Sequence, residues 1–421
     1  MSRRVPLQCR LAVPLPCKHM LTDAAPIPGY GAETLAEVLP SAAALLRAGD
    51  DPLGLTGRVG SARAVVVYLI DGLGASMLDE FADVAPTMSR LSKAAESMTI
   101  RTCIPSTTAA SITSLGTGRA PGEHGMVGYS VFLAEIDCVV NLIHFTKYGR
   151  TKEGTIADRV VPEVIQPHEP VLSRVRHDGI ATFSVSPDHF EGTPLTRAAL
   201  RGPDFVGWKD PGDGIDLVAA VAAEPDGASA QESSRCRLVY TYFSQLDFFG
   251  HIHGRGSAEF CTQLSLVDGL VDRLARELPG DCVLLITGDH GLVNIAESAK
   301  VDFDSDAELS EGVRALSGEP RFRHVHALPG DDARVLDVWR SRLGDDAWVL
   351  TRDEAIRAGW FGPRVESRVA GMIGDVVVAF ASPMGVFQRR VDPLQARLVG
   401  HHGSFTPDES EIPLLVTRGA A

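Results

Sequence analysis

The sequence predicts an α/β fold with a doubly wound, mainly parallel sheet and a smaller inserted α+β cap. Hydrophobic residues make up 44% and aromatic residues 6% of the 421 positions, and 41 positions are glycine. This composition suits aliphatic buried strands joined by tight loops. Short apolar runs also alternate with helix-like stretches, as they do when crossover helices connect parallel strands.

Residues 1–60 are predicted to form an N-terminal extension with one short helix. Within it, residues 33–49 carry apolar side chains at helical spacing before a glycine. The basic start of the chain leads into a stretch that prolines and polar residues interrupt, so we expect no signal peptide. Because no apolar segment approaches about 18 uninterrupted residues, we also expect no membrane span.

Three apolar runs are read as buried strands, and each is followed by a carboxylate. In open α/β sheets, ligands bind at the edge where the carboxyl ends of the strands meet. The sequence therefore predicts a functional site at that edge. The three pairs are 64–70 with Asp71, 237–243 with Asp247, and 282–287 with Asp289.

Crossover helices are predicted between these strands, at residues 86–96 and 257–277. Residues 303–390 alternate strand-like and helix-like stretches without a carboxylate at any strand end, which favours an inserted cap region. The predicted catalytic domain then consists of residues 61–302 and 391–421.

The formal net charge is −14, from 54 acidic and 40 basic residues. Such a field repels polyanions and argues against wrapping by nucleic acid. The seven cysteines are an odd set without a CxxC motif, so neither a disulfide framework nor a thiolate metal site is expected. Reduced thiols are typical of a cytoplasmic protein, which is the location we expect. The oligomeric state stays open.

The segment around Pro105 has the pattern of a helix start. Pro105 biases its predecessor away from helix, and Ser106, Thr107 and Thr108 can all cap a helix that runs to Gly116. Unpaired N–H groups and the helix dipole favour a phosphate or an alkoxide at such a position. A hydroxyl there needs a base or a metal to become a nucleophile. Taken alone, the segment is explained by helix capping.

Further patterns have the residue types of metal ligands. Asp247 and His251 lie on one face if their segment is helical, at a spacing that can hold one divalent ion. Asp289 and His290 stand in a glycine-flanked loop, and His402 ends a histidine pair between two glycines. A helix cap, a chance motif or a surface histidine explains each pattern singly. Their coincidence at strand ends and glycine loops favours a metal site.

The ordered set of motifs over about residues 62–418 resembles the nucleotide pyrophosphatase/phosphodiesterase family of the alkaline phosphatase superfamily. The resemblance implies an alkaline phosphatase-like core with two divalent ions, zinc or alternatively manganese. It also implies a nucleophilic threonine that bridges to the second ion. The implied ligands are Asp247, His251 and His402 for one ion, and Asp71, Asp289, His290 and the nucleophile Thr108 for the other.

Spacing selects Thr108 within the resemblance. The family places Thr-Gly nine and ten residues after the nucleophile, and Thr117-Gly118 follows Thr108 at that distance, which makes Thr107 a neighbour. Two departures bear on the substrate rather than on the metal chemistry. Tyr129 stands where the family usually has a phosphate-contacting Asn, and Ala110-Ser111 replaces the usual Pro-Asn.

The implied activity is hydrolysis of a small anionic phosphate ester, foremost a phosphodiester or nucleotide pyrophosphate bond, through a phospho-threonine intermediate. A phosphonate or phosphomonoester hydrolase or a phosphomutase of the same superfamily is the alternative, and an inert metal-binding module is the alternative from another class. A sulfatase is a weaker rival. Its signature begins like Cys103 to Ser106, but Thr107 stands in place of the required Arg and Cys103 is offset by five positions from Thr108.

Three other histidines are given separate interpretations. His253 lies two residues beyond His251 and is a candidate to support the metal ligands from outside. His324 and His326 alternate on a predicted cap strand and are expected at the surface.

Overall fold

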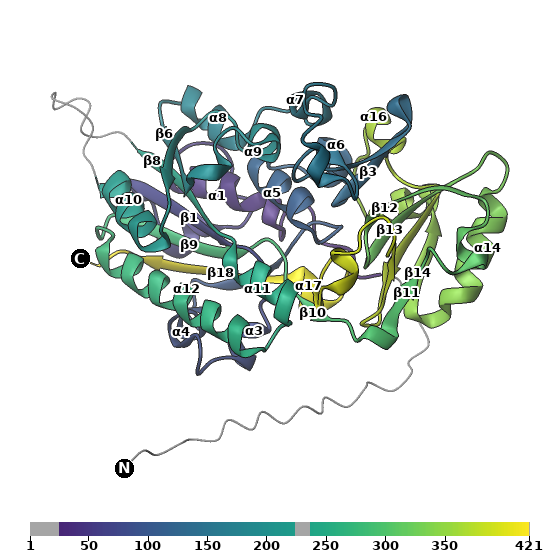
Figure 1. Cartoon of the computed structure of the whole chain (residues 1–421). Coiled ribbons are helices and arrows are strands. Elements are labelled where there is room, and N and C mark those ends of the chain that lie inside the picture. The colour runs from purple at the N-terminus through teal and green to yellow at the C-terminus, as the bar shows by residue number, and fades with distance from the viewer. Residues whose placement is uncertain (1–24, 224–235, 421) are drawn as a thin grey trace, which may run out of the picture.

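The structure is a computed structural model that describes residues 25–223 and 236–420 (Figure 1). Its centre is a seven-stranded sheet in the order β2-β18-β9-β1-β8-β6-β7. The run from β9 to β7 is parallel, whereas β18 is antiparallel to both of its neighbours. The mainly parallel sheet is therefore confirmed. The strands are β1 (Ala64–Ile70), β2 (Met98–Arg101), β6 (Ala181–Pro187), β7 (Asp204–Trp208), β8 (Arg237–Phe243), β9 (Cys282–Gly288) and β18 (Glu411–Arg418).

The three strands predicted to carry the carboxylates lie side by side at the centre of the sheet. Every residue of β1, β8 and β9 is buried, as their aliphatic and aromatic sequences require. In the parallel register, Ile70 at the end of β1 lies opposite Phe243 of β8 and Gly288 of β9. The chain therefore leaves all three strands at one edge of the sheet.

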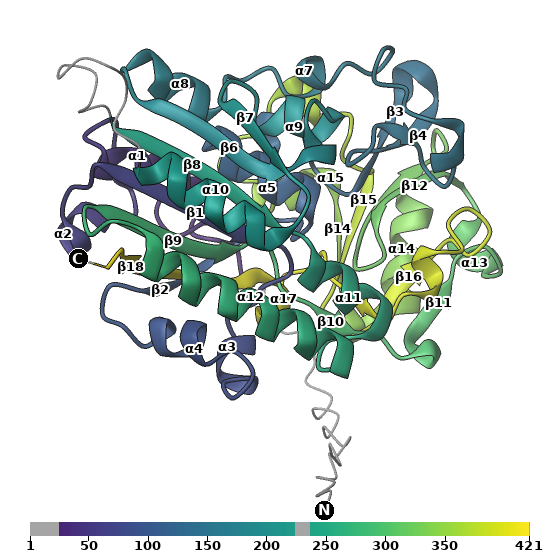
Figure 2. The same ribbon diagram turned by 60° about the vertical axis from the view of Figure 1, so that its left-hand side comes forward.

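Helices cover both faces of the sheet, so that the fold is doubly wound (Figure 2). On α12, apolar residues at helical spacing, from Phe260 to Leu274, are buried against one face. None of the helices in the described ranges is long and apolar enough to cross a membrane. One face holds α4 (Pro86–Ser92), α10 (Pro211–Ala223) and α12 (Ala258–Glu277), and the other α1 (Val38–Leu45), α5 (Thr108–Thr117) and α8 (Val171–His177).

The described part of the N-terminal segment packs on the central sheet. Val38 and Leu39 of α1 are fully buried in the same apolar cluster as the side chains of β1. Thr34 forms an isolated bridge with Arg101 of β2. Residues 25–60 thus contribute to the core, and residues 1–24 lie outside the described ranges.

A second, antiparallel sheet in the order β12-β13-β15-β14 lies beside the main body (Figure 1). Helix α14 (Asp332–Leu343) buries Val335 and Trp339 in the apolar cluster formed with this sheet. We refer to these elements as the cap, and the division into a catalytic domain of residues 61–302 and 391–421 and an inserted cap region of residues 303–390 stays a prediction. The strands are β12 (Val313–Glu319), β13 (Phe322–Ala327), β14 (Ala347–Thr351) and β15 (Val376–Phe380).

The expectation that His324 and His326 lie at the surface was wrong, because both side chains are buried. Nε2 of His324 donates to the carbonyl of Val127 at 2.8 Å, and its Nδ1 accepts from the N–H of Gly374 at 3.2 Å. Nε2 of His326 lies 3.2 Å from Oγ of Ser317. Strand β13 contributes Phe322 to one buried apolar cluster and Val325 to another, so both of its faces are covered and alternation along it leaves no face open to solvent.

Candidate active site

The three predicted carboxylates meet at the carboxyl edge of the central strands. Asp71 follows β1, Asp289 follows β9, and Asp247 lies in α11 (Gln245–His253) just beyond β8. Between them the chain turns at Gly72, whose φ is +78° and whose N–H donates to Oδ1 of Asp289 at 3.0 Å. A Cβ at Gly72 would come within 3.0 Å of the Cα and Cβ of Asp247. Glycine therefore allows the closest approach of these segments.

The three predicted imidazoles use the same nitrogen, Nδ1, to contact the backbone. Each Nδ1 lies within hydrogen-bond distance of a backbone carbonyl, so the proton that it donates leaves Nε2 as the free acceptor. Outer hydrogen bonds of this kind hold the imidazoles of metal sites in place. The pairs are His251 with Gly400 at 2.7 Å, His402 with Ser106 at 2.8 Å, and His290 with Gly291 at 3.0 Å.

The free imidazole nitrogens face the carboxylates. Nε2 of His251 lies 3.2 Å from Oδ2 of Asp247, and Nε2 of His290 lies 3.4 Å from both Oδ1 of Asp71 and Oδ2 of Asp289. One oxygen of each carboxylate is buried without a hydrogen-bond partner. Such oxygens are costly unless a cation or a donor satisfies them, so this donor set fits bound metal.

Two groups of three side chains could each hold an ion, with ligand atoms within 4.8 Å of one another. The first has the same composition as one of the expected ligand sets. The second contains Asp247 where the resemblance implied Asp289, so that Asp247 lies between the two groups. Oδ1 of Asp289 instead accepts from the backbone N–H groups of Gly72 and His290. The groups are Asp247, His251 and His402, and Asp71, Asp247 and His290.

Burial and mutual repulsion dominate the electrostatics of the carboxylates. Burial, reinforced by the charges of Asp289 and Asp247, raises the pKa of Asp71 well above its usual value, although Tyr242 donates a hydrogen bond to its Oδ2. Burial also raises the pKa of Asp289. Burial acts in the same direction on Asp247, but attraction to His251 and its neighbours outweighs it and lowers the pKa of Asp247. A cation would stabilise all three charged forms.

Thr108 is the first residue of α5, as the sequence predicts, and it faces the carboxylate and imidazole cluster. Its Oγ1 lies 3.2 Å from Nε2 of His290. Thr107, with an extended backbone, is the N-cap residue, and its buried Oγ1 has no hydrogen-bond partner. Both threonines line the cavity at the site, but Thr108 has its hydroxyl beside the candidate ligands.

Two residues considered from the sequence lie away from the cluster. Cys103 is fully buried, burial raises the pKa of its thiol to about 12, and its Sγ contacts Oγ1 of Thr34 at 3.8 Å. It does not line the cavity and is unsuited to be a thiolate nucleophile. His253 is exposed and stacks on Phe249, with ring centroids 5.8 Å apart.

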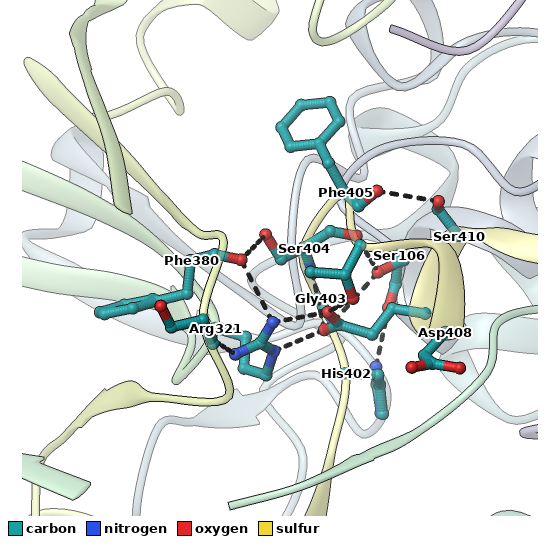
Figure 3. A network of polar contacts seen from close by, with 12 residues as sticks. Ser106, Arg321, Phe380, His402, Gly403, Ser404, Phe405, Asp408 and Ser410 are labelled. Carbon is teal, nitrogen blue, oxygen red and sulfur yellow. Dashed lines mark hydrogen bonds and ion pairs between the residues drawn. The ribbon is translucent and has the colours of Figure 1, made fainter. Parts of the chain in front are cut away.

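A fully buried ion pair joins the cap to the segment that carries His402 (Figure 3). Nε and Nη2 of Arg321 each donate to one carboxylate oxygen of Glu409 at 2.6 Å. The same guanidinium donates to the carbonyl groups of Phe380, Ser382 and Met384. All of its donors thus point at charged or carbonyl oxygen acceptors within the interior.

Hydrogen bonds continue from this pair to Ser106, in the loop that precedes α5 (Figure 3). The N–H of Ser404 donates to Glu409 at 3.1 Å, and Oγ of Ser106 donates to the carbonyl of Ser404 at 2.8 Å. Ser106 also accepts from Nδ1 of His402 at its own carbonyl. The cap is therefore linked to the candidate ligand His402 and to Ser106, two positions before Thr108.

A cavity of about 710 Å³ opens over the site, and it includes a residue that sequence reasoning missed. Glu319 ends β12, is buried and lines this cavity. Its Oε2 accepts from the N–H of Tyr129 at 2.7 Å, its Oε1 has no partner, and burial raises its pKa to about 8. The turn signal Gly318-Glu319-Pro320 marked the end of a strand, where a carboxylate could have been noticed.

The mainly parallel sheet, with carboxylates and imidazoles gathered beside a hydroxyl at a helix start, defines a hydrolytic enzyme built on an α/β core. The family model described as "Type I phosphodiesterase / nucleotide pyrophosphatase" matches residues 65–405, and the chain belongs to this family.

Solved structures resemble this fold, and one curated relative matches part of the sequence. Murine ectonucleotide pyrophosphatase / phosphodiesterase 5 is 16% identical with a TM-score of 0.63, covering 85% of this chain and 88% of its own. An inactive variant of the murine protein, in complex with AMP, has a TM-score of 0.63 at 16% identity, covering 83% of this chain and 87% of its own. The human protein has a TM-score of 0.62 at 16% identity, covering 85% of this chain and 88% of its own. Alkaline phosphatase PhoD of Zymomonas mobilis subsp. mobilis is 24% identical over 184 residues, which are 42% of this chain and 32% of that protein. The chain thus matches about a third of the length of that relative.

Proposed function

We propose that the protein hydrolyses phosphodiester bonds with two divalent metal ions and with Thr108 as the nucleophile. The observation that carries this proposal is that Oγ1 of Thr108 lies 3.2 Å from Nε2 of His290, which itself lies 3.4 Å from buried oxygens of Asp71 and Asp289 that have no hydrogen-bond partner. Membership of the family supports a phosphate ester as the substrate. The complex of the murine structural neighbour with AMP shows that a protein of this fold binds such a ligand.

The donor set determines which metals suit the site. Carboxylate oxygens and imidazole nitrogens favour zinc, and manganese is compatible with them. Bound ions supply Lewis-acid chemistry, which lowers the pKa of a hydroxyl and offsets the charge of the phosphoryl oxygens. Asp247, His251 and His402 would hold one ion, and Asp71, His290 and Asp289, with Asp247 in reach of both, would hold the other.

The residues of the chain divide the reaction into two steps. In the first, Oγ1 of Thr108 forms a bond to phosphorus while the bond from phosphorus to the leaving alcohol oxygen breaks. The hydroxyl proton passes to solvent, and the leaving oxygen takes a proton from water. The N–H groups at the start of α5 favour the negative phosphoryl oxygens. In the second step, water attacks the phospho-threonine ester, which releases the product phosphomonoester and restores Thr108.

The proposal is tested by removing and restoring metal. Protein stripped with a strong chelator is assayed before and after addition of zinc or manganese. The substrates are a phosphodiester, a phosphomonoester, a phosphonate ester and a sulfate ester, each with a 4-nitrophenyl leaving group. We expect turnover only after metal is restored, with the diester as the best substrate. A protein that binds the metal but cleaves none of these esters would be an inert binding module. Turnover that survives complete removal of metal would contradict the proposed mechanism.

A further inference from the structure

The cavity beside Thr108 is much larger than a phosphate group requires. Its volume is about 710 Å³, within the range of about 300–1,000 Å³ that organic ligands occupy. The candidate metal ligands line only one part of it. The remaining walls therefore contact the organic groups of the substrate, and their chemistry indicates what those groups are.

Those remaining walls offer no fixed positive charge. Within residues 25–223 and 236–420, which the structure describes, no lysine or arginine lines the cavity. Burial lowers the pKa of His144, so this imidazole is neutral at neutral pH. The carboxyl groups are Glu319, whose pKa burial raises to about 8, and Asp392. Away from the candidate metal ligands, a second phosphate group would therefore meet no lysine or arginine of the described residues, and it would lie near the carboxyl groups of Glu319 and Asp392.

A neighbouring hollow does not supply the missing charge. It has a volume of about 250 Å³ and shares His189, Ser244 and Gln245 with the larger cavity. Lys209 lines this hollow, but its Nζ lies 4.0 Å from Oδ2 of Asp188, and its side chain is 89% exposed. An exposed lysine beside a carboxylate contributes little net attraction for an anion.

The wall nearest the nucleophile helix is apolar. Ile112 of α5 contributes an aliphatic side chain, and so do Leu195 and Leu200 in and after α9 (Pro194–Ala199). Phe205 of β7 adds an aromatic ring. Serine, threonine and tyrosine hydroxyls, which carry no charge, also line the cavity. Such a surface gains free energy by covering an alkyl chain or an aromatic ring.

The edge of the cavity carries two large apolar side chains that are exposed. Phe248 is 54% exposed and lies on α11 between Asp247 and His251, and Leu394 is 73% exposed. Both line the cavity. Exposed apolar side chains that adjoin a site are typical of surfaces that bind apolar ligands.

We propose that the site selects phosphodiesters whose organic groups are apolar and carry no further phosphate. This inference rests on the proposed function and narrows its substrate. An apolar group is covered by the aliphatic wall and the exposed side chains at the edge. A chain of phosphates would lose hydration without gaining a counter charge, and it would face Asp392.

Two substrate comparisons test the inference. The metal-loaded protein is assayed on methyl, ethyl, propyl and butyl 4-nitrophenyl phosphate, which differ only in apolar length, and on ATP, which adds charge. We expect kcat/KM to rise about threefold per methylene, because each buried methylene adds transfer free energy. We expect kcat/KM for ATP to be at least about a hundredfold lower than kcat/KM for the butyl ester. A flat or falling series, or ATP cleaved as fast as the butyl ester, would overturn the inference. If the metal-loaded protein cleaves none of the four esters, the proposed function itself is refuted.

A pair of exposed residues provides matched variants for the apolar contact. Leu394→Glu places a charge at the edge of the cavity, whereas Val164→Glu places one on α7 (Pro162–Ile165), where Val164 is 69% exposed and outside the cavity lining. The butyl to methyl ratio of kcat/KM should fall at least about threefold in the first variant and stay unchanged in the second. Equal ratios in the two variants, with melting curves that show both folded, would count against the apolar wall.

The charge argument has its own pair of variants. Asp392→Asn removes a charge but keeps the Oδ1 that accepts from the N–H of Gln395 at 3.0 Å. Asp83→Asn removes an exposed charge away from the cavity lining. The ratio of ATP to butyl ester hydrolysis should rise about threefold in Asp392→Asn only. If the two variants leave the ratio alike, the acidic wall does not exclude phosphates.

Discussion

At the scale of single residues, the three candidate metal-binding imidazoles are oriented by backbone carbonyls rather than by each other. His251, His290 and His402 each engage a carbonyl through Nδ1, and their Nε2 atoms are left toward the buried carboxylates. Preset orientation of this kind reduces the entropy lost when an ion binds, so each ring should contribute strongly to affinity.

We predict that His402→Ala weakens binding of one metal ion by at least about tenfold, because a ligand is lost from a set of three. His253→Ala serves as the control, since this exposed histidine stacks on Phe249 outside the cluster. Elemental analysis and competition with a chelator measure both variants. Equal loss of metal from the two proteins would contradict the assignment of His402.

Short motifs made most of these residues predictable. Asp289 and His290 are adjacent, and Asp247 and His251 are one helical turn apart, so local spacing is enough to group them. The position of Asp247 between the two ion groups and the role of Glu319 were not predictable in this way. Both depend on contacts between segments far apart in the sequence, and no local pattern encodes those contacts.

At the scale of elements, the central question is how the cap is held against the sheet edge. Gly403, next to His402, has a φ of +138°, and a Cβ there would come within 2.6 Å of Cγ of Glu319. Arg321, two residues after Glu319, forms a fully buried ion pair with Glu409, which follows Gly403 in the same segment of the chain. The end of β12 and the segment after β17 (Gly400–His401) thus form one joint.

We predict that Arg321→Met lowers the free energy of unfolding by about 3–5 kcal/mol, because the buried carboxylate of Glu409 loses its partner. Arg389→Met is the matched control. Its pair with Glu297 is exposed, so its loss should cost less than about 1 kcal/mol. Urea denaturation of both variants makes the comparison. A similar loss in both would show that the buried pair does not hold the joint.

Sequence patterns predicted the elements better than their burial. Helix α12 agrees with the predicted range because its apolar periodicity is long, and strands β1, β8 and β9 agree because each is a compact apolar run. The burial of His324 and His326 was missed, since an alternating strand was taken to have one exposed face. Cover on both sides of β13 removed that face, and cover of this kind is set by tertiary packing.

At the scale of the whole molecule, the buried histidines of the cap make stability depend on pH. Burial lowers the pKa of His324 to about 4 and that of His326 to about 3, below the usual value of 6.5. Between these values the unfolded chain binds protons that the folded chain does not. Stability is therefore complete above about pH 6.5 and is lost as the pH falls toward 4.

We predict that the free energy of unfolding of the metal-free protein falls by about 1.4 kcal/mol per pH unit for each such histidine over this range. His326→Gln should reduce that slope, because one buried group no longer takes up a proton on unfolding. Denaturation at a series of pH values between 6.5 and 4 measures it. An unchanged slope in the variant would mean that His326 is not the group responsible.

The whole architecture brings a sheet edge, a helix start and a cap together around one hydroxyl. The central claim is that this hydroxyl, Oγ1 of Thr108, attacks phosphorus. Thr107→Ala is the natural comparison, because the neighbouring threonine also lines the cavity but its Oγ1 has no bond to a candidate ligand. Replacing a threonine at a helix start by alanine lowers the free energy of unfolding by only about 1 kcal/mol, so both variants should remain folded.

The most direct test is the turnover of bis(4-nitrophenyl) phosphate by zinc-loaded Thr108→Ala and Thr107→Ala measured side by side with their melting curves. We predict that Thr108→Ala loses turnover by about a thousandfold or more while melting almost as the unaltered protein does, and that Thr107→Ala loses far less. Near-normal turnover by a folded, metal-loaded Thr108→Ala protein would contradict the covalent mechanism and the assignment of its nucleophile.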